Sequence, residues 1–378
     1  MKTVYDNKEH CSGCGACNHS CKLHAIQMKK DEEGFLYPVI DQKLCVQCGK
    51  CKKACPFIKE NVKNGIPEVY AAKNLSDAVR KTSASGGIFT LMSDYVLQQN
   101  GVVYGAVFGE DMQVAHIRAV TEEKRDAMRG SKYVQSFLGD VFLQVEQDVK
   151  ENRMTLFSGT PCQVAGLKAY LNKDYPNLLC CDIVCHGVTS PKVFQDYLSY
   201  LEEKHHSKVT QMCFRDKEQG WSNQKWKATL QSGKILLDNG DVNVYKHLYY
   251  SHVMQRPSCH QCPYTSTERQ GDITIGDYWG IENSLPEFKD ELGVNVLFVN
   301  TEKGAAVFEQ IKSNMNYVKS ELSSCLQPQL QYPTEKSKKR ELFWQDYEKS
   351  GFPYVAKKYG TVSLMDHFKS KIKRLIGK

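Results

Sequence analysis

Two cysteine runs with the same spacing lie within the first 60 residues of the chain. In each run three cysteines are separated by two residues, a fourth follows after three more, and Pro56 comes directly after the second run. A cubane iron–sulfur cluster needs four thiolates that converge on soft iron, and closely spaced cysteines can surround one corner of it. The two runs therefore predict two [4Fe–4S] clusters.

The order of the cysteines also predicts which cluster each one binds. In the known two-cluster pattern, the last cysteine of each run serves the other cluster. The first predicted set is Cys11, Cys14, Cys17 and Cys55, and the second is Cys45, Cys48, Cys51 and Cys21. The segment resembles the bacterial two-cluster ferredoxin domain, although Lys22 stands where that pattern usually has proline.

A disulfide scaffold and zinc knuckles are the alternatives for these runs. Zinc sites usually show two Cys-x2-Cys pairs that are a dozen or more residues apart. Here four cysteines are compressed into one run, and the arrangement is then repeated. This spacing favours iron–sulfur clusters over zinc.

Composition is typical of a soluble globular protein. Hydrophobic residues make up 41% and charged residues 25% of the 378 positions, and no apolar run approaches the ~20 residues that cross a bilayer. The N-terminus lacks the apolar stretch of a secretory signal peptide. We therefore expect a cytoplasmic protein whose 16 cysteines stay thiols and metal ligands.

The formal charge of +7 is not concentrated in a block that would predict nucleic-acid binding. The C-terminal tail is the basic exception, and residues 367–376 are expected to form a short amphipathic helix. A solvated terminal helix is favoured over a weak contact of this tail with an anionic membrane surface or an acidic partner.

The remaining sequence predicts an α+β (mixed α/β) fold in which a larger domain follows the small ferredoxin-like one. A polar linker after residue 58 marks the change. We expect domains at 1–60 and 66–325, and a basic, partly helical tail at 326–378. Predicted strands cover 68–72, 101–108, 155–157, 209–214, 226–230, 272–277 and 294–299. Predicted helices cover 87–98, 137–151, 163–171, 191–205, where Ser190 is the expected cap, and 305–311.

A Ser/Gly-rich segment at 83–87 opens the first of these helices. Its glycines would let backbone amides approach an anion, and a helix N-terminus adds partial positive charge, so a phosphate would be stabilised there. An ordinary capped helix start is equally compatible with the pattern. The basic turn at 129–133 could add a cation and hydroxyl groups to the same ligand, or it could be an exposed turn.

Four further cysteines lie beside glycine or proline in predicted loops. Loop cysteines can point at a shared metal, so Cys162, Cys185, Cys259 and Cys262 are a candidate third [4Fe–4S] site. A zinc hook plus two unrelated thiols is the alternative. Cys180, Cys181, Cys213 and Cys325 are expected to be small buried residues. His186, next to Cys185, is a candidate proton donor, although a structural hydrogen bond is the commoner role of such a histidine.

Five short sequence motifs, taken in their order along the chain, resemble those of the family of coenzyme F420 hydrogenase/dehydrogenase beta subunits. The resemblance covers roughly residues 66–320. The motifs are 85–87, 130–133, 159–163, 185–191, and 259–262 leading to 272–277. The resemblance implies a bound FAD with an iron–sulfur cluster close to it, so the larger domain is expected to bind flavin. By position, it implies that Ser85, Gly86, Gly87 and Thr90 approach the FAD phosphates or ribityl chain, that Ser131 and Lys132 lie near the flavin, and that the four loop cysteines are cluster ligands.

These features together predict a flavin-dependent iron–sulfur oxidoreductase. Electrons would pass from a ferredoxin-like donor through the [4Fe–4S] clusters to FAD, and on to a small-molecule substrate or a deazaflavin. The alternative function is a non-catalytic electron-transfer (beta) subunit of a larger hydrogenase or dehydrogenase complex. Fold resemblance alone does not identify the substrate.

Overall fold

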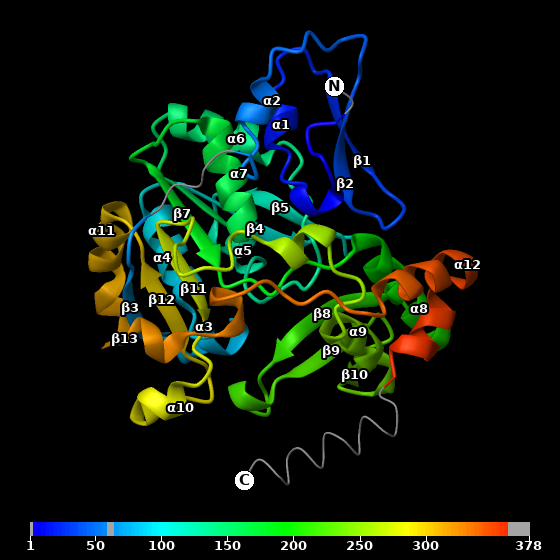
Figure 1. Cartoon of the computed structure of the whole chain (residues 1–378). Helices are drawn as coiled ribbons and strands as arrows, with labels where there is room; N and C mark the ends of the chain where they lie inside the picture. The colour runs from blue at the N-terminus through cyan, green and yellow to red at the C-terminus, as the bar shows by residue number, and fades with distance from the viewer. Residues whose placement is uncertain (1–2, 59–63, 362–378) are drawn as a thin grey trace.

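An eight-stranded mixed sheet forms the centre of the molecule in the computed structural model, which describes residues 3–58 and 64–361 (Figure 1). The strand order is β13-β3-β12-β11-β7-β6-β4-β5. The four strands β11, β7, β6 and β4 run parallel, and the strands at both sides of them pair antiparallel. Their bounds are β3 Glu68–Asn74, β4 Val102–Phe108, β5 Val114–Ala119, β6 Thr155–Gly159, β7 Leu178–Ile183, β11 Ile273–Asp277, β12 Asn295–Val299 and β13 Met315–Ser320.

Helices cover both faces of this sheet, because successive strand residues point to opposite sides. Leu156 packs in one core with α4 (Ile88–Gln98) and α11 (Glu302–Ile311), whereas the next residue, Phe157, packs in another core with α6 (Val141–Lys150) and α7 (Pro161–Leu171). The short helices are α3 Asp77–Thr82, α5 Glu122–Asp126 and α10 Ile281–Ser284. The result is a helix–sheet–helix arrangement with a buried parallel centre.

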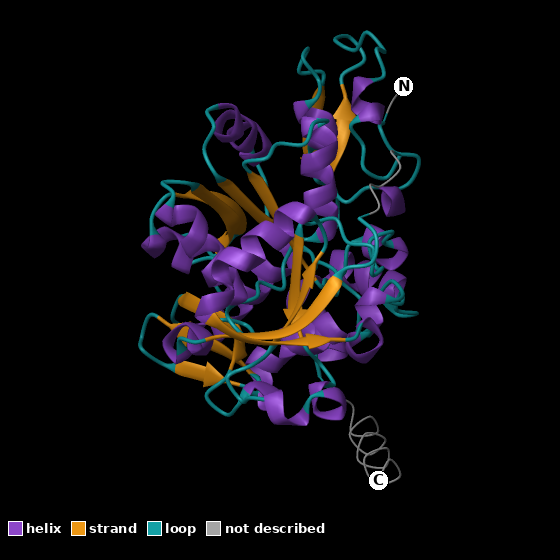
Figure 2. Cartoon of the chain, turned by 90° about the vertical axis from the view of Figure 1, so that its left-hand side faces the viewer, coloured by secondary structure: helices purple, strands orange, loops and turns teal. Residues whose placement is uncertain are grey.

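The N-terminal module is small and stands on the α6–α7 side of the sheet (Figures 1 and 2). It contains the antiparallel hairpin β1 (Ile26–Lys30) and β2 (Leu36–Ile40), and the one-turn helices α1 (Ala16–His19) and α2 (Lys50–Lys53). Helices α1 and α2 contact each other, and α1 also packs against both α6 and α7. The side of the module that carries the first cysteine run therefore faces the sheet domain.

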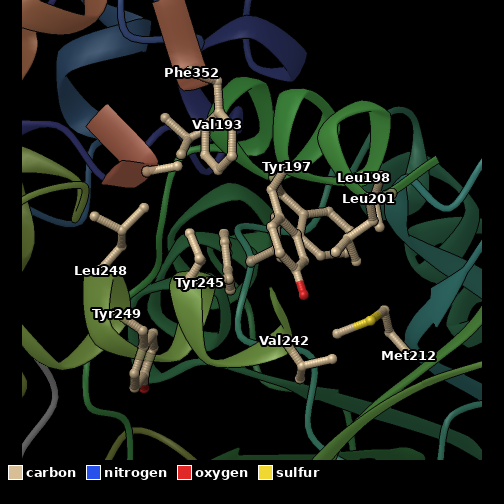
Figure 3. Close-up of a cluster of buried hydrophobic side chains, with 14 of the residues drawn as sticks. Val193, Tyr197, Leu198, Leu201, Met212, Val242, Tyr245, Leu248, Tyr249 and Phe352 are labelled. Carbon is tan, nitrogen blue, oxygen red and sulfur yellow. The ribbon is translucent and has the colours of Figure 1, made fainter. Parts of the chain in front are cut away.

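A second lobe carries the three-stranded antiparallel sheet β10 (Ile235–Leu237), β9 (Lys225–Leu230) and β8 (Val209–Asp216). Three helices, α8 (Pro191–His205), α9 (Gly240–Tyr250) and α12 (Arg340–Tyr359), pack with this sheet. Figure 3 shows their shared core, in which Tyr197, Tyr245 and Phe352 come from three different helices. The 3-10 helices of the described chain are Lys8–His10, Trp221–Asn223, Pro257–Gln261, Pro286–Phe288, Lys312–Asn314, Leu322–Cys325 and Pro328–Leu330.

The mixed α/β class and the order of a small module before a larger sheet domain are confirmed. Helix α8 begins and ends where the sequence predicts, and its cap is Ser190, whose hydroxyl accepts a hydrogen bond from the Val193 amide at 3.2 Å. The predicted helix at 137–151 begins later, at Val141, because Phe137 bridges to β5 in extended backbone. Among the other cysteines, Cys180, Cys181 and Cys325 are buried as expected, whereas Cys213 is half-buried.

The segment from residue 326 contributes to the core of the second lobe. Helix α12 bends at Gly351 (φ 73°) and buries Phe343, Tyr347, Phe352 and Val355. The expected basic helix at 367–376 lies outside the described residues. No helix of the described chain is long and apolar enough to cross a membrane.

The packing of α12 generates a test of stability. Phe352 is 4% exposed, and its replacement by alanine should lower the free energy of unfolding by about 3–5 kcal/mol, because the ring leaves a cavity in a packed core. Tyr354, two residues later, is 44% exposed, so Tyr354→Ala should cost roughly 0.5 kcal/mol or less. Denaturant unfolding of both variants measures the difference, and equal effects would contradict this packing of α12.

Candidate functional site

The cysteines of the N-terminal module lie in two adjoining sets. The pKa of Cys14 is raised to about 12 by burial and by the nearby thiolates of Cys55 and Cys11. Burial also raises the pKa of Cys17, with further contributions from Cys14, Cys11 and Cys55. We call Cys11, Cys14, Cys17 and Cys55 the inner group, because its Cys14 and α1 contact the sheet domain.

The other set contains the remaining cysteines of both runs. The pKa of Cys51 is raised by burial and by the Cys45 and Cys21 thiolates beside it, whereas Cys48 is exposed to solvent. We call Cys45, Cys48, Cys51 and Cys21 the outer group. These neighbours are compatible with the crossed ligand sets expected from the sequence, and their ligation of iron remains a prediction.

The four loop cysteines also lie near one another. Burial raises the pKa of Cys185 to about 12 and that of Cys259 to about 11, and each thiol also responds to the charge of Cys162. The pKa of Cys262 is raised by burial and by the charges of the other three cysteines. We call Cys162, Cys185, Cys259 and Cys262 the third group.

The donor chemistry of the third group suits an iron–sulfur cluster. The Gly187 amide donates to the sulfur of Cys185 and the Val188 amide to that of Cys259, both at 3.4 Å, and the Thr160 hydroxyl lies 3.1 Å from the sulfur of Cys162. Hydrogen bonds to cysteine sulfur are a recurrent means by which proteins stabilise a bound cluster. All sixteen cysteines are free thiols. Among the described residues, no set of three or more Cys, His, Asp or Glu side chains is placed to hold a single metal ion.

Two buried side chains connect the inner group with the third group. Burial raises the pKa of Tyr264, and charges on cysteines of both groups raise it further. These cysteines are Cys162 and Cys262 of the third group and Cys14 and Cys55 of the inner group. The Tyr264 hydroxyl donates to the carbonyl of Pro56 at 3.1 Å. Arg256, which is 1% exposed, donates to the carbonyl of Cys11 at 2.7 Å and precedes Cys259 in the chain.

A cavity of about 460 Å³ lies beside the third group, and Cys185 is part of its wall. The wall also contains the last residues of β6, β7 and β11 and the turns that follow them, so the cavity opens at the carboxyl ends of the parallel strands. This edge is where open α/β sheets usually bind ligands. Of the residues expected to contact FAD, the cavity wall includes Ser85, Gly87, Ser131 and Lys132.

Gly86 and Thr90 do not belong to the cavity wall. A side chain at Gly86 would come within 2.6 Å of the Ala72 carbonyl, so this glycine serves the close packing of the loop on the sheet. Thr90 is buried, and its hydroxyl accepts a hydrogen bond from Arg129 at 3.1 Å. Arg129 itself lines the cavity. Thr90 is thus placed to orient Arg129 and does not itself contact the cavity.

Lys132 projects into a set of backbone acceptors at the cavity wall. Its ammonium group donates to the carbonyls of Ala127 and Arg129, both at 2.9 Å, and of Gly130 at 3.3 Å. Loss of solvent lowers the pKa of Lys132 to about 7, while the three carbonyl acceptors favour the charged form. The side chain can therefore present a cation or a neutral amine to a ligand near neutral pH.

His186 has partners at both ring nitrogens. Nε2 lies 3.0 Å from Nε2 of His252, and Nδ1 accepts a hydrogen bond from the Gln329 amide at 2.9 Å. The ring stacks on Tyr249, and burial lowers the pKa of His186 to about 4. This environment favours a neutral, structurally held imidazole at the cavity wall. A catalytic role for His186 stays a prediction.

The cavity wall also contains Arg215, Asp277 and Trp279, which take part in an ion pair and a tryptophan stack that the sequence did not predict. Arg215 donates to Asp277 at 2.7 Å, and Trp221 donates to the same carboxylate oxygen at 2.8 Å. Trp221 stacks on Trp279 with an interplanar angle of 2°. In the sequence, Asp277 ends the strand predicted at 272–277, and the aromatic residues Tyr278 and Trp279 follow it. The partners Arg215 and Trp221 come from a distant part of the chain.

Comparison with known proteins finds similarities in both parts of the chain. Residues 152–324 match the family described as the C terminus of the coenzyme F420 hydrogenase/dehydrogenase beta subunit. Over these residues the chain is similar to this family. Residues 10–58 and 37–87 match two families that are both described as 4Fe–4S dicluster domains, so the segment similar to the beta subunits follows a segment similar to iron–sulfur modules.

Similar proteins occur in Methanocaldococcus and Methanosarcina. An uncharacterized protein of Methanocaldococcus jannaschii is 23% identical over 82% of this chain and 89% of its own length. The F subunit of the F420H2 dehydrogenase of Methanosarcina mazei is 21% identical over 81% of this chain and 83% of its own length. A chain in a solved structure of the F420-reducing [NiFe] hydrogenase complex of Methanosarcina barkeri is 18% identical, with a TM-score of 0.47, over 79% of this chain and 95% of that one.

His116 is buried at the cavity wall, and its environment leads to a prediction about pH. His116 donates from Nε2 to the Ser158 carbonyl at 3.0 Å, and Nδ1 accepts from the Ser136 hydroxyl at 2.9 Å. Burial lowers the pKa of His116 to about 4, below the value of 6.5 expected in an unfolded chain. Below pH 6.5 the unfolded chain therefore binds more protons at this group than the native state does. The free energy of unfolding should fall by up to about 1.4 kcal/mol for each unit by which the pH is lowered.

We expect His116→Gln to flatten the fall of the unfolding free energy between pH 6.5 and pH 5, relative to the unmodified chain. His24→Gln, at an exposed position, is the matched control and should leave the slope unchanged. Denaturant titrations of the three proteins at several pH values measure the slopes. The same slope in the His116 and His24 variants would show that His116 does not titrate as a buried neutral group.

Proposed function

We propose that this chain is the iron–sulfur electron-transfer subunit of an oxidoreductase complex, related to the beta subunits of coenzyme F420 hydrogenases and dehydrogenases. One observation carries the proposal: the three cysteine groups follow one another from a solvent-exposed end to the wall of a cavity. Similarity to a protein named as part of F420H2 dehydrogenase supports a role within a complex. A reducing compartment such as the cytoplasm would suit the sixteen free thiols.

The order of the groups is the basis for a path of electrons. Cys48 of the outer group is exposed, while Cys14 of the inner group and both Cys180 and Cys181 near the sheet centre are buried. A negative charge on Cys51 raises the pKa of Cys17, and a negative charge on Cys162 raises the pKa of Cys14. Each group is therefore close enough to the next for their charges to interact. Clusters bound in this order would carry single electrons between the exposed end and the cavity.

A flavin in the cavity is the finer part of the proposal. FAD accepts electrons one at a time or in pairs, and it would connect the clusters to two-electron chemistry. Ser85, Gly87 and Ser131 supply polar groups at the wall, and Lys132 supplies an amine near phosphate or ring oxygens. The cavity of about 460 Å³ lies within the size range of cofactor pockets, and Cys185 borders it directly.

The second candidate function is an enzyme that reduces a small molecule without a permanent partner. The cavity favours it, because its wall combines the exposed Trp279 with the paired Arg215 and Asp277, groups that suit a planar, polar substrate. Purification from the native source distinguishes the two. A stable partner protein supports electron transfer within a complex, and turnover by the isolated chain with reduced ferredoxin supports the enzyme.

The exposed end of the outer group suits an acidic redox partner. Five lysines surround it in sequence and all are exposed: Lys22, Lys43, Lys50, Lys52 and Lys53. None of them forms an ion pair with a carboxylate in the part of the chain that the structure describes. The apolar side chains of Leu23, Leu44 and Val46 are exposed among them. A basic rim around apolar contacts is a surface that an acidic electron-transfer protein can recognise.

Counting iron in anaerobically purified protein tests the cluster assignment. Three clusters require about twelve irons per chain, and two require about eight. We expect about twelve irons and one flavin per chain, and we expect Cys262→Ser to reduce the iron to about eight because it removes a ligand of the third group. Cys325→Ser is the matched control, since Cys325 is a buried thiol outside the three groups. About eight irons in the unmodified chain would overturn the third cluster, and absence of flavin would overturn the cofactor proposed for the cavity.

Charge reversal tests the docking end. We expect Lys50→Glu combined with Lys52→Glu to slow reduction of the chain by an acidic reduced ferredoxin roughly tenfold at low salt, because the basic rim no longer attracts the donor. The difference should shrink at high ionic strength, where such attraction is screened. Reduction by dithionite should stay unchanged.

The control for this experiment is Lys349→Glu combined with Lys357→Glu, which changes the same charge on the exposed side of α12 in the second lobe (Figure 1). Stopped-flow absorbance of the clusters gives the rate constants. An equal rate for both double variants at low salt would place the donor at another surface.

A further inference from the structure

Arg256 is a buried cation that has no carboxylate partner. It is 1% exposed, and no carboxylate of the described chain forms an ion pair with it. A buried charge without a counter-charge is strongly unfavourable. The other buried arginines of the described chain all follow this rule. Arg80 pairs with Asp290, Arg125 with Asp94, Arg269 with Asp182, and Arg340 with Glu33.

Arg256 contacts both the inner group and the third group. Nη2 is 3.8 Å from the sulfur of Cys11, and Nε donates to the Cys11 carbonyl at 2.7 Å. Toward the third group, the Cys259 amide donates to the Arg256 carbonyl at 2.9 Å, and the positive charge of Arg256 lowers the pKa of Cys162 and of Cys259, against the rise that burial causes in both. One cation therefore acts on thiols of both groups.

Several contacts fix the guanidinium in this place. It donates to the Gln135 side chain at 3.0 Å and to the Leu36 carbonyl at 2.9 Å, and it lies 4.3 Å from the ring centre of Tyr37. Gly13 leaves room for it, because a Cβ at that position would be 2.9 Å from Nη1. Leu36 belongs to the N-terminal module and Gln135 to the sheet domain, so the same side chain joins the two parts.

We propose that Arg256 is the counter-charge that the inner and third clusters share, and that it raises the reduction potential of both. This inference rests on the proposed function, because it requires clusters on these two groups. A cluster with four thiolate ligands carries negative charge, and reduction adds more, so a fixed cation beside it stabilises the reduced state. Net charge and hydrogen bonds to sulfur are the means by which a protein sets this potential.

Arg256 thus acts as a positioning and tuning residue for the clusters. Arginine stays protonated throughout the physiological pH range, so its effect on the potentials should not depend on pH. The outer group is not among the contacts of Arg256, and its cluster should be independent of this residue. The predicted effect is therefore selective for two of three clusters.

A redox titration followed by electron paramagnetic resonance tests this proposal on the intact, cluster-loaded chain. In Arg256→Gln we expect the midpoint potentials of two clusters to shift to lower values, with the third unchanged. Arg256→Lys retains the charge, so its midpoint potentials should stay close to those of the unmodified chain. Arg125→Gln is the control for the loss of a buried arginine remote from the cysteines, and it should leave all the potentials unchanged.

The possible outcomes separate this inference from the proposed function. Unchanged potentials in Arg256→Gln with full iron content overturn the counter-charge role of Arg256. An equal shift in Arg256→Lys and Arg256→Gln also overturns it, because charge would then be irrelevant. If Arg256→Gln loses iron, retention of iron and of native potentials in Arg256→Lys supports the proposal, and loss of iron in both variants contradicts it. If the unmodified chain lacks iron on the inner and third groups, the proposed function itself fails.

Discussion

The seating of Cys14 against Gly166 is the contact on which the rest of the arrangement depends. A side chain at Gly166 would lie 2.8 Å from Cβ and Sγ of Cys14, so only glycine in α7 allows the first cysteine run to approach the sheet domain this closely. Cys14 and Ala16 then share one core with Phe142 and Val164. This apolar contact brings the inner group near the third group, because the latter begins at Cys162 on the same helix.

The parallel centre of the sheet positions the remaining site. Strand β6 leads into the first turn of α7, which carries Cys162, and β7 leads into the loop that carries Cys185. Strand β11 ends in Asp277 at the same edge. A parallel arrangement brings all these carboxyl ends to one side, where their turns can surround a ligand. The cavity and the third group therefore lie together as a consequence of strand direction, although the contributing residues are far apart in the chain.

Much of the fold could be predicted from periodicity and caps. Helix α8 was defined to the residue by Pro191, Ser190 and the apolar spacing, because local signals and tertiary packing agree there. The site was predictable where chemistry is concentrated in short motifs, as in the cysteine runs. Thr90 shows the limit of such reasoning. The family resemblance implied a ligand contact for Thr90, whereas in the structure its hydroxyl accepts a hydrogen bond from Arg129. Arg256 had no signal at all, because its meaning comes from groups that are far away in sequence.

Burial of the thiols links metal loading to charge. The pKa values of Cys14 and Cys185 are raised to about 12, so without metal these cysteines are protonated and neutral at physiological pH. Iron binds thiolates, so iron binding at these cysteines would release protons and create negative charge inside the protein. The amides of Gly187 and Val188 donate to the sulfurs of Cys185 and Cys259, and Arg256 contacts both the inner group and the third group. The protein interior thus buries these cysteines as neutral thiols. Its amide donors and the Arg256 cation would stabilise the same cysteines as thiolates, and the thiolates would balance the charge of Arg256.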